Sequence, residues 1–96
     1  DFDSPNSKVI GSEYVATSIS SGGDGQDMTD YGSHLLSNNE HVKFYNANRG
    51  YVAVTLTPDL WQTDYKIVPY ITTRGAPISI RKTYVTEAGK PGVQEA

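Results

Sequence analysis

The sequence has no cysteine, a single methionine and no apolar run near the length of a membrane span. Without cysteine the chain has neither a disulfide framework nor a thiolate metal site, although this absence does not indicate a compartment. A transmembrane helix needs roughly 18 or more consecutive apolar residues, so no spanning segment is expected. The opening residues DFDSPNSK are polar and acidic and do not have the apolar core of an export signal.

Basic residues are also few. The 8 Lys and Arg are spread along the chain and are outnumbered by 11 Asp and Glu, which gives a net charge of −3. A protein that binds nucleic acid usually concentrates Lys and Arg into a patch that follows the phosphates. The sequence has no such cluster, so we do not expect a nucleic-acid partner.

The apolar content predicts a thin core. Apolar residues make up 36% of the 96 residues, below the roughly 45–50% typical of soluble domains when glycine is included. Seven Tyr and one Trp offset part of this deficit, because aromatic side chains bury large areas. A chain this short buries only about 60–65% of its unfolded surface. We expect either modest stability or a chain that rests against something larger.

The clearest structural signal is the alternation of apolar and polar residues in 51–57 and 61–68. Alternation with period two is typical of strands with one buried face. The intervening sequence TPDL has turn chemistry, because Pro58 presets the dihedral of the second position of a type I turn. An antiparallel hairpin is therefore predicted, with Phe44 and Tyr45 on a shorter strand before it.

Three further elements are predicted. Residues 9–20 and 78–86 are rich in β-branched and aromatic side chains, which favours strands. Residues 27–39 are expected to form a short helix, with Asp27 or Thr29 capping the exposed amides at its start. The predicted fold class is mainly β with one short helix, an α+β arrangement of antiparallel strands.

Two segments have no predicted regular structure. The loop 20–26, SSGGDGQ, is too rich in glycine, and residues 88–96 read as an irregular tail. Glycine lets backbone amides approach a phosphate, but this loop lacks the Lys-Ser/Thr of a P-loop and does not match GxGxxG. No GxSxG surrounds its serines, so a serine hydrolase is not expected. Arg49, in NANRG, is interpreted either as part of a polar turn or as a clamp for an anion.

Candidate metal ligands are sparse. Asp24, Asp27 and Asp30 offer oxygen atoms, but their spacing of three does not match the alternate ligands of a calcium-binding EF-hand. His34 and His41 are the only histidines, whereas a zinc hydrolase needs three protein ligands. Helix caps, solvated acids and surface histidines are the favoured interpretations.

Several stretches together resemble the C-terminal end of alkaline phosphatase D-type enzymes. They are, in order, TSISSGGDG, the N-x-RGY turn, TPDLWQTDY followed by VPY, and GAP ahead of the last strand. The likeness runs from DFDSP almost to the final residue, with one departure at Ala16, where the family usually carries Gly. It implies that residues 1–96 are a single C-terminal segment of a larger phosphatase domain. Its strands would form part of a calcineurin-like metallophosphatase β-sandwich.

The same resemblance implies an extracellular or periplasmic enzyme that hydrolyses phosphodiesters and phosphomonoesters with calcium and iron. In such enzymes the metal ligands precede the part present here, so no catalytic residue and no metal ligand is assigned to this chain. Two-metal hydrolysis needs several Asp, His and Asn ligands held together, and this sequence does not offer such a set. The residues expected nearest the substrate are Ser20, Ser21, Gly22, Gly23 and Arg49.

The isolated chain is therefore expected to be inactive, and its expected partner is the upstream catalytic portion of the same protein. Strand edges cut from a larger sheet would also favour homo-oligomers of the isolated fragment. The alternative is a free-standing β binding module for a cell-wall polymer or a protein partner. In that case the aromatic residues would form a stacking platform instead of a core: Phe44, Tyr45, Tyr51, Trp61, Tyr65 and Tyr70.

Overall fold

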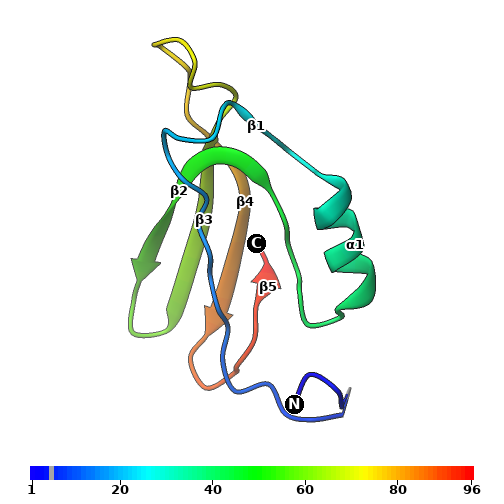
Figure 1. Cartoon of the computed structure of the whole chain (residues 1–96). Helices are drawn as coiled ribbons and strands as arrows, with labels where there is room; N and C mark the ends of the chain where they lie inside the picture. Colours follow the sequence, from blue (N-terminus) through cyan, green and yellow to red (C-terminus); the bar gives the residue numbers. More distant parts are fainter. Residues whose placement is uncertain (5) are drawn as a thin grey trace.

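The computed structural model describes residues 1–4 and 6–96, which form mainly antiparallel sheet with one short helix (Figure 1). The sheet has five strands whose spatial order follows the sequence, β1-β2-β3-β4-β5. The α+β fold class expected from the sequence is confirmed. The elements are β1 Gly25–Gln26, α1 Asp30–Asn38, β2 Ala47–Leu56, β3 Leu60–Val68, β4 Ser79–Glu87 and β5 Gln94–Glu95.

The β2–β3 hairpin forms where the alternation predicts it. Val52 lies opposite Tyr65, so the apolar positions of the two strands share one face. The turn is closed by Thr57 and Leu60: the Thr57 amide donates to the Leu60 carbonyl at 2.8 Å, and the Leu60 amide donates to Thr57 Oγ1 at 3.1 Å. Strand β4 then pairs with β3, and a register shift at Tyr65 and Lys66 bends this pair.

The core is a small cluster of aromatic rings on the face that carries Tyr65. Tyr84 is 7% exposed and is the only buried large apolar side chain among the described residues. The Phe44 ring lies 5.0 Å from Tyr65 and 6.0 Å from Tyr84 between centroids, and the two tyrosines meet edge to face. Such geometries place the positive edge of one ring on the negative face of another. The composition predicts a thin core, and the observed core is the cluster of the Phe44, Tyr65 and Tyr84 rings.

Two buried polar residues of β3 have hydrogen-bond partners. Thr63 is fully buried, and its Oγ1 accepts a 2.7 Å bond from Trp61 Nε1. Asp64 is 9% exposed and accepts a 2.6 Å bond from Thr83 Oγ1 on the neighbouring strand, as well as a longer bond from Gln62. Buried polar groups of this kind are tolerated because they are paired.

Helix α1 begins after Thr29, which the structure selects as the N-cap over Asp27. Thr29 has extended dihedrals, and its Oγ1 accepts a 2.9 Å bond from the Gly32 amide. The same hydroxyl lies 2.9 Å from the hydroxyl of Tyr45. Gly32 is buried against the Tyr45 ring, where a Cβ atom would overlap the ring carbons. One cap therefore both starts the helix and attaches it to the segment that leads into β2.

Replacing Thr29 with alanine is expected to lower the free energy of unfolding by about 1–2 kcal/mol, because the cap and the bond to Tyr45 are both lost. Thr29→Ser keeps the hydroxyl and should cost much less. Urea-induced unfolding followed by circular dichroism measures both variants. Equal losses for the alanine and serine variants would contradict the capping role.

Several sequence expectations for the short elements are wrong. Residues 9–20 are not a strand in this chain, and Phe44–Tyr45 lies outside any strand, because neither segment has a backbone partner in the described residues. Conversely, β1 and β5 are short strands within the two segments expected to be irregular. Helix α1 has 9 residues, and no helix in the described part of the chain is long and apolar enough to cross a membrane.

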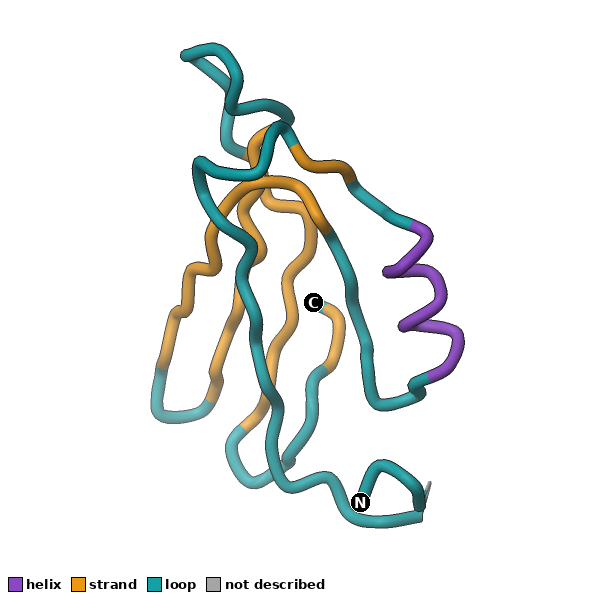
Figure 2. The backbone as a smooth tube through the Cα atoms, viewed as in Figure 1, coloured by secondary structure: helices purple, strands orange, loops and turns teal. Residues whose placement is uncertain are grey.

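The N-terminal segment runs along one face of the sheet as a separate layer (Figures 1 and 2). Tyr14 stacks on Trp61 with ring centroids 6.1 Å apart, and Thr17 Oγ1 donates a 2.6 Å bond to the Asn48 carbonyl. These two contacts fasten the segment to β3 and β2 through side chains.

Candidate functional site

The glycine-rich loop and Arg49 come together at one end of the sheet. Arg49, on β2, donates through Nη1 to Ser18 Oγ. That hydroxyl in turn donates a 2.8 Å bond to the Ser21 carbonyl. A Cβ atom on Gly22 would lie 3.5 Å from Arg49 Nη1. The guanidinium group therefore lies directly against the loop, which joins the two features that the sequence singled out separately.

The backbone of this loop requires glycine at specific positions. Gly22 and Gly23 have φ angles of 82° and 79°, which side chains other than glycine rarely adopt. Gly25 has a φ of 72°. A Cβ atom there would overlap the carbonyl oxygen of Ala47 on β2 and lie 3.1 Å from Arg49 Nε. Ser20 is exposed, and its side chain forms no hydrogen bond among the described residues. Of the five residues expected nearest the substrate, Gly22 lies against the Arg49 side chain, and Ser21 is linked to Arg49 through the Ser18 hydroxyl.

Asp24 fastens the same loop to the β3–β4 connection. Its Oδ1 accepts the amides of Ile71 at 2.8 Å and Thr72 at 3.0 Å, and its Oδ2 accepts the Thr72 hydroxyl at 3.2 Å. The Ile71 amide, followed by that of Thr72, holds the pKa of Asp24 below its ordinary value. From the sequence, Asp24 was considered only as a poorly spaced candidate calcium ligand. Its actual partners, Ile71 and Thr72, lie 47 and 48 positions away in the chain, so the local sequence does not reveal them.

Asp27 is engaged by a different set of partners. Arg81 on β4 binds both carboxylate oxygens, through Nε at 2.6 Å and Nη2 at 3.2 Å. Asn46 Nδ2 donates a further 2.8 Å bond. The Arg81 hydrogen bond is the main cause that lowers the pKa of Asp27. This pair ties the segment that precedes α1 to β4.

The remaining candidate ligands do not gather. Asp30 lies in the first turn of α1, the His34 carbonyl accepts from Asn38 within the same helix, and the His41 ring stacks on Phe2 at 4.0 Å. Across residues 1–4 and 6–96, no three His, Cys, Asp or Glu side chains are grouped to hold a metal ion.

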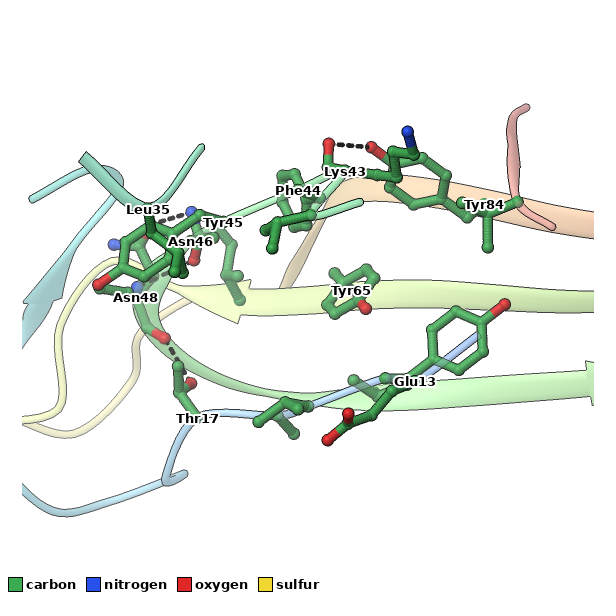
Figure 3. Close-up of a pocket in the computed structure, with 18 of the residues that line it drawn as sticks. Glu13, Thr17, Leu35, Lys43, Phe44, Tyr45, Asn46, Asn48, Tyr65 and Tyr84 are labelled. Carbon is green, nitrogen blue, oxygen red and sulfur yellow. Dashed lines mark hydrogen bonds between the residues drawn. The ribbon is translucent and has the colours of Figure 1, made fainter. Parts of the chain in front are cut away.

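A cavity of about 560 Å³ separates the N-terminal segment from the sheet (Figure 3). Phe44, Tyr65 and Tyr84 form one wall, and Glu13 and Thr17 lie across from them. Burial raises the pKa of Tyr65 above its ordinary value. Arg49 and the loop residues 18–25 do not line this space. The cavity therefore lies between the N-terminal segment, the segment 41–47 and the sheet, and it is separate from the Arg49 loop.

Acid is expected to release the glycine-rich loop. The folded pKa of Asp24 lies below its unfolded value, so its contribution to stability is present above about pH 4 and is lost as pH falls through the folded pKa. An NMR titration should show the Ile71 and Thr72 amides shifting together below pH 4. In Asp24→Asn the two amides should show no such acid step. An unchanged step in that variant would contradict the assignment.

A model of the PhoD-like phosphatase family matches residues 1–65, which is more than half of the chain. The chain belongs to the PhoD-like phosphatase family. Alkaline phosphatase D from Bacillus subtilis (strain 168) is 41% identical over 95 residues, which cover 99% of this chain and 16% of that protein. A solved structure described as "Structure of PhoD" matches 100% of this chain and 18% of its own, with 41% identity and a TM-score of 0.93.

These matches confirm the resemblance that the motifs carried, from TSISSGGDG to the last strand. The chain spans less than a fifth of the length of the PhoD relatives that it matches. Because the structural match covers the whole chain at a TM-score of 0.93, the unpaired N-terminal segment and the glycine-rich loop follow a backbone path shared with PhoD.

Proposed function

We propose that this chain is the C-terminal structural portion of a PhoD-like phosphoesterase whose complete form hydrolyses phosphodiesters and phosphomonoesters. The observation that carries the proposal is the structural match, which takes in all of this chain but only 18% of the PhoD chain. The related Bacillus protein carries the name alkaline phosphatase D. On this proposal the enzyme is extracellular or periplasmic, and the sheet is one layer of a calcineurin-like β-sandwich.

The distribution of apolar side chains supports a larger protein around this chain. Ile10 is 93% exposed, Val15 71% and Leu56 67%. Large aliphatic side chains are among the residues most often buried in folded domains, so exposure of this extent favours a larger protein that covers part of this chain. The upstream catalytic portion is the proposed cover.

Calcium and iron, the metals implied by the family, would be held by that upstream portion. The donor groups of this chain do not fit such a role: Asp24 and Asp27 already bind Thr72 and Arg81, and no three potential ligands gather among the described residues. No reaction step is assigned to this chain. Its proposed contribution is to hold the loop 18–25 and Arg49 at the edge of the active site.

The isolated 96-residue chain is expected to give no hydrolysis of bis(p-nitrophenyl) phosphate above buffer when calcium and iron are supplied. The complete polypeptide from the source should hydrolyse the same substrate, and a metal chelator should stop it. The release of p-nitrophenol measures both. Turnover by the isolated chain would refute the proposal that this chain has only a structural role. A complete polypeptide without activity would refute the proposal that the whole protein is a phosphoesterase.

The alternative of a free-standing binding module needs exposed aromatic rings on one face. Tyr51 and Trp61 are 38% and 37% exposed, but they lie on opposite faces of the β2–β3 hairpin. Tyr31, which is 68% exposed, lies on α1. These rings do not form one platform. The phosphoesterase portion is therefore the function that the observations favour.

A further inference from the structure

Arg49 carries a positive charge that no acid neutralises in the part of the chain that the structure describes. The residue is half-buried, and its Nε is enclosed without a hydrogen-bond partner among the described residues. None of the ion pairs formed by these residues includes Arg49. Its side chain donates to one neutral group, the Ser18 hydroxyl. A cation withdrawn from water without a counter-ion is costly, so such a group is normally paired or binds an anion.

Arg81 shows how this chain satisfies a guanidinium group that has a structural partner. It donates through Nε at 2.6 Å and Nη2 at 3.2 Å to the two carboxylate oxygens of Asp27, so its charge and its Nε are both satisfied. Arg49 differs in both respects, because its Nε lacks an acceptor and its Nη2 forms no hydrogen bond within residues 1–4 and 6–96. A buried polar group without a partner calls for an explanation in structure or in function.

The glycine-rich loop places backbone, and no carboxylate partner, against this guanidinium group. The one acid of the loop, Asp24, accepts backbone amides of the β3–β4 connection and forms no ion pair with Arg49. Figure 1 shows the loop and this connection at the same end of the sheet. A Cβ atom would lie 3.5 Å from Arg49 Nη1 on Gly22 and 3.1 Å from Nε on Gly25. Without side chains at these positions, an anion can approach the backbone and the guanidinium closely.

We propose that Arg49 binds the non-bridging oxygens of the substrate's phosphate group through Nη1 and Nη2 and thereby contributes to specificity for phosphate esters. This inference rests on the proposed function. The planar guanidinium matches two phosphate oxygens as a fork, and its delocalised charge would be compensated as a whole. Nη1 keeps a second N–H after its bond to Ser18, so both outer nitrogens can donate. Ser18 is a positioning residue, since its hydroxyl is itself fixed by the 2.8 Å bond to the Ser21 carbonyl.

Binding of inorganic phosphate to the complete polypeptide, followed by isothermal titration calorimetry, tests this contact. Arg49→Gln removes the charge and is expected to weaken phosphate binding by about 10–100-fold, because a charge-assisted forked contact is lost. Arg49→Lys keeps the charge but not the fork, so a smaller loss of about 3–10-fold is expected. Phosphate affinities of both variants within about twofold of the wild type would overturn the inference. A wild-type polypeptide that binds no phosphate would overturn it as well.

Arg74→Gln is the matched control, because it removes the same charge from the exposed β3–β4 connection. Its phosphate affinity should equal that of the wild type, and a loss as large as that of Arg49→Gln would overturn the assignment to Arg49. Urea-induced unfolding of the same proteins tests the competing partner, a carboxylate of the upstream portion. A less stable Arg49→Gln protein with unchanged phosphate affinity would identify that carboxylate and contradict the proposal. If Arg49→Gln does not fold, the phosphate affinity of Arg49→Lys decides the question.

Hydrolysis of bis(p-nitrophenyl) phosphate by the same preparations separates this inference from the proposed function. In an active enzyme, Arg49→Gln should raise KM by about 10-fold or more. An active enzyme whose Arg49 variants bind phosphate as tightly as the wild type would overturn the Arg49 contact and leave the phosphoesterase standing. A complete polypeptide that binds phosphate through Arg49 but has no phosphoesterase activity would support the contact and overturn the function.

Discussion

Gly50→Ala is expected to lower the free energy of unfolding by about 3 kcal/mol. Gly50 is buried in β2 opposite Ile67. A Cβ atom at this position would overlap the carbonyl oxygen of Lys66 and lie 2.9 Å from the Cα of Ile67. Both obstacles are backbone atoms of the paired strand, so no side-chain rotation relieves the overlap and β2 must separate from β3.

Gly11→Ala provides the control. A Cβ atom on Gly11 would meet nothing within 4 Å, and its φ angle is not in the left-handed region. This substitution restricts the unfolded chain to the same extent as Gly50→Ala, and its effect should stay below about 1 kcal/mol. Urea-induced unfolding of the purified protein measures both variants. A Gly50→Ala protein as stable as the control would show that β2 and β3 do not approach as described.

Tyr84→Ala is expected to destabilise the protein by about 3–5 kcal/mol. Tyr84 is the most buried aromatic side chain described, and its ring packs against both Phe44 and Tyr65. Removing its ring leaves a space beside the existing cavity, which Tyr84 already borders. The lost contacts therefore have no replacement nearby. Thermal and urea unfolding measure the loss.

Tyr84→Phe separates the ring from its hydroxyl. The hydroxyl donates a 3.2 Å bond to the Lys43 carbonyl, and its loss should cost about 1 kcal/mol. Burial raises the pKa of Tyr84 above its unfolded value, so ionisation of its hydroxyl makes stability depend on pH. The phenylalanine variant has no ionisable hydroxyl at this position and loses that dependence. That contribution to stability is present below about pH 10 and is lost as pH rises through the folded pKa. A phenylalanine variant as unstable as the alanine variant would contradict the packing role.

The elements predicted correctly are those whose signals lie within a few residues of each other. Pro58 sets the turn of the hairpin, and the alternation on either side sets the faces of β2 and β3. Thr29 caps α1 through an amide only three residues ahead. These interactions are local, so the sequence contains both partners within one short window.

Residues 9–20 show the opposite case. Their β-branched side chains correctly indicate an extended segment, but strand formation needs a second backbone, and the described residues do not provide one. Propensity reports how well a side chain suits a pleated surface and not whether a partner strand is present. The prediction of a strand was wrong because strand formation depends on two paired segments, whereas the sequence pattern describes only one of them.

The candidate site was predictable only in its parts. The glycine loop and Arg49 each attracted attention, but their contact through Ser18 joins residues 31 positions apart. The clamp from Asp24 to Ile71 spans 47 positions. Nothing in the local sequence links such pairs, because the β1–β2 pairing and the β3–β4 connection bring them together. Whether Arg49 approaches a substrate stays a prediction.

The two-residue strand β5 has a consequence for solubility. Strand β5 covers the outer edge of β4 at two residue pairs, Tyr84 with Glu95 and Val85 with Gln94, and Glu95 also forms an ion pair with Lys82. An open strand edge is a template for uncontrolled addition of other chains, and charged side chains along it oppose that addition. Removal of β5 would expose the edge of β4 at Tyr84 and Val85. Lys82 would then have lost its ion pair with Glu95, and its charge on β4 would oppose the addition of further strands in amyloid-like growth.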